Sequence, residues 1–235
     1  MPLDFIALAL AVIHFGTPLT YYFYLKNKYL SKPWNINADE NYKPKVTIII
    51  PTYNEAKLIE KKLNNIYKQK YPRDKLEVIV VDSASTDGTP KLIKKWADKH
   101  SELNLKLIVE SERKGKAHAL NLGLKHATGD IIIITDADSY WLHQNTLRTV
   151  ASYFADPQIG AVSCTKIPDG KKVPKIEANY RRFYNIIRIA ESKAYATPIF
   201  HGELAAFRKE LLEKLRGFPT DIGADDSHTA TKVAL

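Results

Sequence analysis

The chain has 235 residues, 45% hydrophobic and 26% charged, a globular composition with room for one large domain and a substantial core. Its one cysteine, Cys164, excludes an internal disulfide framework and fits a reducing compartment. The formal net charge of +9 favours an anionic partner. Nucleic acid is disfavoured as that partner, because the lysines are scattered and no nucleic-acid-binding motif is found, which leaves anionic lipid and phosphorylated ligands.

The first predicted element is a helix over residues 5–25, which carry no formal charge apart from a possible one on His14. A helix of this length spans about 30 Å, the thickness of one hydrocarbon core. Three lysines follow the segment, at positions 26, 28 and 32, and a lysine-rich flank is typical of the cytoplasmic side. The sequence therefore predicts a membrane anchor over residues 1–30, in the cell membrane, with everything downstream in the cytoplasm.

Two other interpretations of this apolar segment compete with the anchor. Gly16, Thr17 and Pro18 stand in its middle, which also fits an amphipathic or core helix, and this alternative stays open. A cleaved signal peptide is less favoured, because no basic residue precedes the apolar run and Asp4 is acidic.

Residues 31–44 form a polar linker, and from residue 45 onward apolar strands alternate with helical patterns. The expected strands cover residues 45–50, 77–81, 105–109, 131–134 and 159–163. The expected helices follow the first four strands and end near residues 70, 100, 126 and 154. Repeated strand–helix units with short connections predict an α/β fold with a largely parallel sheet and right-handed crossovers.

Polar clusters follow the predicted strands. They cover residues 51–55, 82–87, 115–116 and 136–138. Each cluster alone is better explained as a turn or a helix cap. Because the carboxyl ends of parallel strands meet at one edge of a sheet, we expect all four to line one crevice. Together they offer carboxylates for a base edge, a ribose and a metal, and a cation for phosphate.

The fourth cluster directly follows four isoleucines, which are typical of a strand buried on both faces. It places Asp136 and Asp138 at the carboxyl edge of that strand. Their hard oxygens suit Mg²⁺ or Mn²⁺, and such an ion suits a diphosphate. An Asp-rich turn is the alternative explanation of the same residues.

These motifs together resemble the inverting family-2 glycosyltransferases, over roughly residues 45–230. The matching stretches are 48–55 (IIIPTYNE), 80–89 (VVDSASTDGT), 115–123 (GKAHALNLG), 135–139 (TDADS), 159–162 (IGAV), 202–209 (GELAAFRK), 217–218 (GF) and 224–226 (ADD). The resemblance implies a GT-A fold, a Rossmann-like, mainly parallel sheet flanked by helices. It also implies a catalytic domain over residues 45–235.

The resemblance implies a nucleotide site built from the first three clusters. Pro51, Tyr53 and Glu55 would flank the base and the ribose. Asp82 would contact the base, and Lys116 would lie near the base or the diphosphate.

The resemblance also implies the catalytic and metal-binding residues. Asp136 would hold the ribose and a metal-bound water, and Asp138 would bind Mg²⁺ or Mn²⁺ directly. Asp226 would be the general base, in a pair whose first member is Asp225 where the family usually has Glu. His228 would offer a further metal ligand or, equally, a solvated or capping side chain.

Residues 174–195 predict a long helix with an apolar stripe beside arginines. It would lie on a membrane surface near a lipid-linked acceptor, or pack on the sheet with its basic face in water. The sequence lacks the Gln-x-x-Arg-Trp motif and the further membrane helices of processive polysaccharide synthases. We therefore expect either a C-terminal truncation or a single-anchor enzyme that adds one sugar.

The expected function is metal-dependent, inverting transfer of a hexose from a UDP- or GDP-sugar to a lipid-linked or glycan acceptor. A polyprenyl-phosphate hexose synthase and a catalytically silent nucleotide-sugar-binding membrane protein are the alternatives. Nucleotidyltransferases share the sheet topology, but residues 51–55 stand where their Gly-rich phosphate loop is expected.

Overall fold

The computed structural model describes residues 2–167, 174–223 and 225–235, which form two compact units. The helical unit comprises Met1–Asn35 and Thr165–Thr197, and the sheet unit comprises Ile36–Cys164 and Pro198–Leu235. Residues 36–44, predicted as linker, thus belong to the sheet unit, and residues 165–197 group with the N-terminal helix. The functional division into anchor, linker and catalytic domain stays a prediction.

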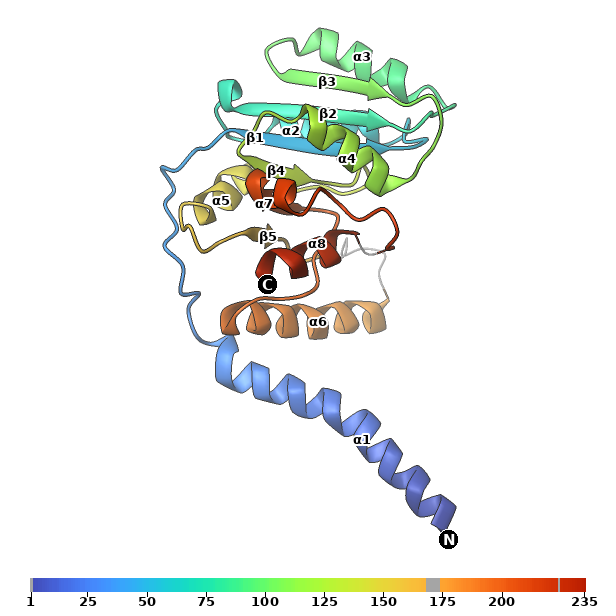
Figure 1. Ribbon diagram of the computed structural model, residues 1–235, viewed down its shortest axis with the longest axis vertical. Helices are drawn as coiled ribbons and strands as arrows, with labels where there is room; N and C mark the ends of the chain where they lie inside the picture. The colour runs from blue at the N-terminus through green and yellow to red at the C-terminus, as the bar shows by residue number, and fades with distance from the viewer. Residues whose placement is uncertain (1, 168–173, 224) are drawn as a thin grey trace. The chain divides into compact units, whose positions relative to one another are not determined.

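The sheet unit is built on one six-stranded sheet with the order β3-β2-β1-β4-β6-β5 (Figure 1). Its strands are β1 (Val46–Thr52), β2 (Leu76–Asp82), β3 (Asn104–Val109), β4 (Ile131–Ile134), β5 (Ala161–Ser163) and β6 (Ala205–Arg208). Neighbours among β1 to β4 pair in parallel, whereas β6 runs antiparallel to both β4 and β5. The largely parallel sheet is confirmed, and β6 is an addition that the strand prediction missed.

Strand β1 runs through Pro51, where the sequence predicted that it would stop. The carbonyl of Ile49 accepts a hydrogen bond from the Thr135 amide on the β4 side. Pro51, two residues later, turns its nitrogen to the same side, past the last residue of β4. The missing N–H of proline therefore costs no ladder hydrogen bond there.

Helices cover both faces of the sheet. They are α2 (Ile59–Tyr67), α3 (Thr89–Lys99), α4 (Lys116–His126), α5 (Thr146–Tyr153), α7 (Lys209–Lys214) and α8 (Asp225–Ala234), with a short η2 (Arg73–Lys75). The first four confirm predicted helices. Alternate strand residues face opposite cores: Ile48 packs in the core that includes α2, α3 and α5, and Ile49 in the core that includes α4, α7 and α8.

The four isoleucines of β4 are each at most 1% exposed, which confirms the prediction of a strand buried on both faces. They alternate between the two cores, with Ile131 and Ile133 in one and Ile132 and Ile134 in the other. The strand is therefore held rigidly, and it fixes the position of the segment that directly follows it.

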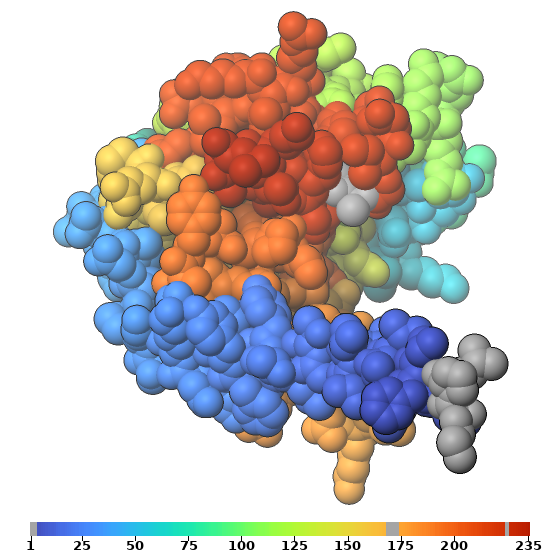
Figure 2. All heavy atoms as spheres, turned by 60° about the horizontal axis from the view of Figure 1, so that its bottom comes forward, coloured from blue at the N-terminus to red at the C-terminus, as the bar shows by residue number. Residues whose placement is uncertain are grey.

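The helical unit contains α1 (Pro2–Leu25), the π-helix η1 (Lys26–Leu30) and α6 (Lys175–Ala194). The ring of Tyr22 stacks on that of Phe183 with centroids 4.6 Å apart, and the Tyr21 hydroxyl donates to Glu191 at 2.8 Å. Figure 2 shows the side chains of α1, in blue, beside the orange side chains of α6. Among the described residues, one helix, over residues 4–30, is long and apolar enough to cross a membrane.

Candidate active site

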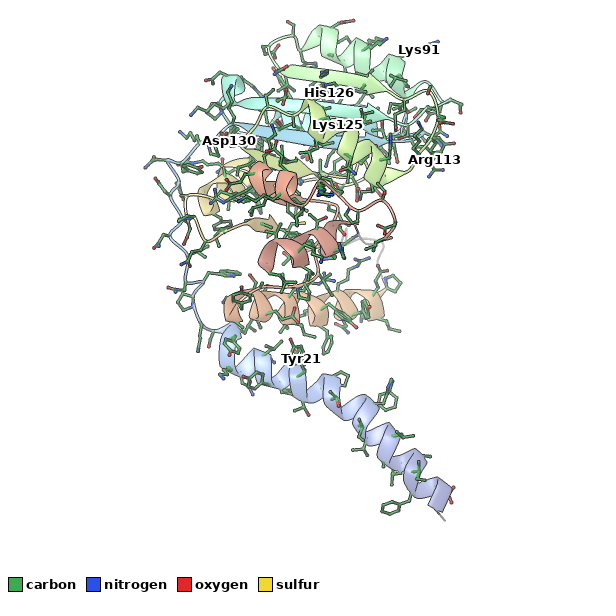
Figure 3. All side chains as sticks on the ribbon, viewed as in Figure 1. Tyr21, Lys91, Arg113, Lys125, His126 and Asp130 are labelled. Atoms are coloured by element: carbon green, nitrogen blue, oxygen red, sulfur yellow. The ribbon has the colours of Figure 1, made fainter. Side chains whose placement is uncertain are left out.

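The loops that leave β1, β2 and β4, and the segment before α4, line one cleft of about 250 Å³. Its walls are Pro51, Thr52, Tyr53, Glu55, Ser83, Arg113, Gly115, Lys116, Asp136, Ala137 and Asp138. The cleft lies at the carboxyl end of the parallel strands. Figure 3 shows Arg113 at that end of the sheet and Asp130, which precedes β4, at the other. All four polar clusters thus contribute to one crevice, as the sequence predicted.

Asp136 and Lys116, which both line the cleft, form an ion pair with Nζ and Oδ1 2.7 Å apart. The backbone amide of Asp136 donates to the carbonyl of Gly202 at 2.9 Å. A Cβ atom at position 202 would lie 2.6 Å from Asp136 Oδ2 and 2.7 Å from Lys116 Nζ. Glycine at 202 therefore leaves the room that this ion pair occupies.

Asp138 lies two residues further on and is exposed. Among the described residues it has no hydrogen-bond or ion-pair partner. Its carboxylate oxygens are therefore available to a ligand, whereas one oxygen of Asp136 is already neutralised by Lys116.

A cationic and an aromatic side chain pair in the wall of the cleft. The guanidinium carbon of Arg113 lies 4.1 Å from the ring centroid of Tyr53. Such a contact holds a flat surface in place, and flat aromatic and guanidinium surfaces are what nucleobases stack on. Arg113 was not singled out from the sequence, although it precedes the Gly115-Lys116 motif by only two residues.

Hydrogen bonds join the loop after β1 to the loop after β2. The amide of Asn54 donates to Ser85 Oγ at 2.8 Å, and the amide of Glu55 donates to Thr89 Oγ1 at 2.9 Å. Asn54 has a φ of 57°, a left-handed conformation that asparagine tolerates better than most residues. These contacts fix the backbone that carries Tyr53 and Glu55 into the cleft.

Asp82 is fully buried and is not among the residues that line the cleft. Its Oδ1 accepts from the Ser85 amide at 2.9 Å, and its Oδ2 accepts from Ser85 Oγ at 2.6 Å and from Thr52 Oγ1 at 3.2 Å. Asp82 therefore shapes the loop in this structure, and its contact with a base stays a prediction.

Ser83 stands in the wall of the cleft beside Asp82, and the sequence prediction gave it no role. Its hydroxyl donates to buried Glu110 at 2.7 Å, and the other oxygen of Glu110 lies 2.6 Å from His118 Nδ1. This chain ties β2, the end of β3 and α4 together behind the cleft. A sequence pattern does not reveal it, because the three residues are far apart in the chain.

The acidic side chains of the cleft crowd one another. The pKa of Glu55 is raised by burial and by the negative charges of Asp138, Asp87 and Asp136. A divalent cation relieves such repulsion. No group of three or more His, Cys, Asp or Glu side chains poised to hold a metal occurs among the described residues. Two carboxylates fit a magnesium- or manganese-type site in which phosphate oxygens and water complete the shell.

Asp226 lies in the first turn of α8 and outside the set that lines the cleft. Its Oδ1 accepts from the Ser227 amide at 2.7 Å. Ser227 Oγ in turn accepts from the Phe200 amide at 3.1 Å, which ties this turn to the segment before Gly202. The structure thus brings Pro51, Tyr53, Glu55, Lys116, Asp136 and Asp138 together and leaves Asp82 and Asp226 outside the lining of the cleft.

A mainly parallel sheet with carboxylates, a lysine and an aromatic ring at its carboxyl edge defines a ligand-binding α/β domain of the nucleotide-binding type. Residues 47–216 match the model of the family described as glycosyl transferase family 2. The match covers more than half of the chain, which therefore belongs to this family. It ends before Asp226.

Among solved structures, the chain is similar to the mannosyltransferase PcManGT from Pyrobaculum calidifontis, in complex with GDP-Man and Mn²⁺. The two are 60% identical with a TM-score of 0.90, over 98% of this chain and 63% of the other. This likeness confirms the GT-A fold. Staphylococcus aureus TarS 1-349 in complex with UDP-GlcNAc is 25% identical with a TM-score of 0.61, over 81% of this chain and 53% of the other.

Two curated relatives are longer proteins. The poly-β-1,6-N-acetyl-D-glucosamine synthase of Staphylococcus aureus is 29% identical over 92% of this chain and 52% of its own length. The glycosyltransferase AglE of Haloferax volcanii is 36% identical over 54% of this chain and 42% of its own length. The chain spans about half the length of the curated relatives it matches.

Proposed function

We propose that this protein transfers mannose from GDP-mannose, with inversion, in a reaction that needs Mn²⁺ or Mg²⁺. The observation that carries the proposal is the cleft itself, where Asp138 is free of protein partners and Asp136 is paired with Lys116. The likeness to a GDP-Man- and Mn²⁺-bound mannosyltransferase at 60% identity supports the donor and the metal. Within the sequence-based expectation of a UDP- or GDP-hexose, we therefore favour GDP-mannose.

In this proposal, different residues of the cleft bind different parts of the donor. Tyr53, stacked by Arg113, presents its ring to the base, and Glu55 lies on the ribose side. Asp138 would hold the divalent ion, and Asp136 would assist on the same side. When bound, that ion neutralises charge on the leaving diphosphate. Lys116 adds a positive charge on the same side, and it is already held in place by Asp136.

The acceptor side of the proposed reaction depends on Asp226. In an inverting transfer the acceptor hydroxyl attacks the anomeric carbon from the face opposite the diphosphate, so a carboxylate must take its proton. Oδ1 of Asp226 accepts from the Ser227 amide and so has a fixed orientation. The other carboxylate oxygen, Oδ2, is the one we assign to the proton.

We expect the donor to be identified by how much it raises the unfolding temperature of the protein. A ligand that binds only the folded state raises the unfolding temperature, and an excess of about 100 Kd adds about 2.7 kcal/mol. GDP and GDP-mannose with Mn²⁺ should therefore raise it clearly more than UDP or UDP-sugars with Mn²⁺, and more than GDP with EDTA. Equal shifts for the UDP and GDP series would contradict the choice of donor, and no shift with any nucleotide would contradict the proposed function.

We also propose that the protein works at the cytoplasmic face of the cell membrane on a lipid-linked or glycan acceptor. Helix α1 is 24 residues long, and most of its large apolar side chains are exposed, among them Phe5 at 76% and Phe15 at 68%. On α6, Ile176 and Tyr180 are 84% and 61% exposed. Exposed apolar surface on two helices of one unit is typical of a membrane contact.

The full chain is therefore expected to float with liposomes and to stay with them through washes with concentrated salt and alkali, because burial of α1 in hydrocarbon does not depend on charge. The chain without residues 1–30 should be released by the salt wash. Release of the full chain by salt alone would contradict the anchor.

A further inference from the structure

A lysine side chain is completely buried directly behind the two aspartates of the cleft. Lys62 is the fourth residue of α2, it has no exposed surface, and it is among the largest fully buried side chains of the described residues. Lysine is almost never fully buried without a partner, because removing its charge from water is costly. Its position therefore calls for a role that offsets the cost.

The ammonium group of Lys62 uses all three of its protons in hydrogen bonds. Nζ donates to Thr135 Oγ1 at 2.6 Å, to the Ser139 carbonyl at 2.9 Å and to Ser139 Oγ at 3.0 Å. Thr135 and Ser139 directly flank the segment 136–138 that carries the two carboxylates. Lys62 thus holds both ends of the carboxylate loop, which we define as residues 135–139.

Further hydrogen bonds make this contact part of one network. Ser139 Oγ donates to the Asp136 carbonyl at 2.9 Å, and Thr135 Oγ1 donates to the Glu203 carbonyl at 2.6 Å. Glu203 follows Gly202, whose carbonyl receives the Asp136 amide. The carboxylate loop is thereby fixed between α2 on one side and the segment before β6 on the other.

Among the described residues no carboxylate contacts the charge of Lys62, since its acceptors there are hydroxyls and a carbonyl. Burial lowers the pKa of Lys62 to about 7, while the negative charges of Asp136 and Asp138 act in the opposite direction. The two largest of the charges that offset the burial of this ammonium are therefore those of the cleft aspartates, ahead of Cys164 and Glu203. The Trp141 ring, with its centroid 5.1 Å from Nζ, adds a further favourable contact.

We propose that Lys62 is a positioning residue for the proposed metal site: it fixes the carboxylate loop so that Asp138 is held ready for a divalent cation. It does not touch the donor, since it is buried behind the loop and is absent from the lining of the cleft. This inference rests on the proposed function, because it assigns Asp138 to a metal. This role explains why a charged side chain is buried here, although an apolar side chain of similar size would often pack there at no cost in stability.

The test is the Lys62→Met variant, which keeps the length of the side chain and removes its charge and its three hydrogen bonds. Loss of a residue that orients a metal ligand costs about 10- to 100-fold in metal affinity, and we expect an increase in the dissociation constant of Mn²⁺ within that range. Bound Mn²⁺ is counted from the loss of the free-ion signal in electron paramagnetic resonance, in the presence of GDP. GDP affinity without metal should not change.

Two companion variants keep the result interpretable. Lys68→Met removes an exposed lysine just after the same helix and should leave Mn²⁺ affinity at the wild-type value. Ser139→Ala deletes one acceptor of Lys62, so it should weaken Mn²⁺ binding in the same direction, and it tests the idea even when Lys62→Met does not fold.

The outcomes separate the inference from the function on which it rests. Folded Lys62→Met protein with wild-type or higher Mn²⁺ affinity would overturn the positioning role, and so would wild-type affinity in Ser139→Ala. Failure of the wild-type protein itself to bind Mn²⁺ with GDP would instead overturn the proposed function.

Discussion

Replacing Asp138 with alanine is expected to abolish Mn²⁺-dependent binding of the donor and to lower turnover by about a thousandfold. Asp138 is exposed at the carboxyl end of β4, and among the described residues no hydrogen bond or ion pair occupies it. Asp136 cannot replace it, because one of its oxygens already pairs with Lys116 at 2.7 Å. The initial rate of GDP release from GDP-mannose, titrated with Mn²⁺, measures the effect.

The fold should tolerate this change, since Asp138 makes no hydrogen bond or ion pair with another described residue and its charge acts on buried Lys62 only from a distance. The unfolding temperature without ligand is therefore expected to stay at the wild-type value. Asp98→Ala, at an exposed position on α3, is the matched control and should retain both activity and metal dependence. If the rate of GDP release by the Asp138→Ala protein depended on the Mn²⁺ concentration as it does in the wild type, this residue would be ruled out as the metal ligand.

The sheet and the crevice could be predicted because both depend on local patterns. Runs such as Ile131–Ile134 are apolar and β-branched throughout, which identifies a strand covered on both faces before any contact is known. In a parallel sheet the carboxyl ends of these strands meet at one edge, so the residues that follow the strands gather there. The convergence of Tyr53, Lys116 and Asp136 required no further information.

The rest of the site depends on contacts between distant parts of the chain. Strand β6 has only four residues, and its partners in β4 lie 71 to 77 positions earlier in the sequence, so no local repeat of apolar residues identifies it. Lys62 stands in an amphipathic helix, where a lysine ordinarily faces water. Only the packing of α2 against the carboxylate loop makes it a buried charge.

Asp82 illustrates a different limit of sequence interpretation: its position was predicted, but its use was not. A carboxylate at the end of a buried strand predicts a ligand contact, and the structure uses its oxygens for the Ser85 amide, the Ser85 hydroxyl and Thr52. An acidic residue in a strand-end motif can serve either the ligand or the loop. Sequence pattern does not separate these uses, because both require the same residue type at the same position.

Asp226→Asn is expected to lower transfer by about 10²- to 10⁴-fold, the usual contribution of a general base. Asparagine keeps the shape of the side chain and can still accept from the Ser227 amide, so the first turn of α8 should stay in place. Binding of GDP and Mn²⁺ should also be unchanged, because Asp226 does not line the cleft. The rate of GDP release from GDP-mannose at saturating donor reports the loss, and a thermal shift with GDP reports the retained binding.

Asp225→Asn is the matched control, since the two acids are adjacent and only one of them can be the base. We expect Asp225→Asn to retain most of the turnover and Asp226→Asn to lose it. The reverse result would move the base to Asp225 and leave the proposed chemistry intact. Full turnover in both variants would instead remove this acidic pair from the mechanism, because neither carboxylate would then be needed to accept the proton of the acceptor hydroxyl.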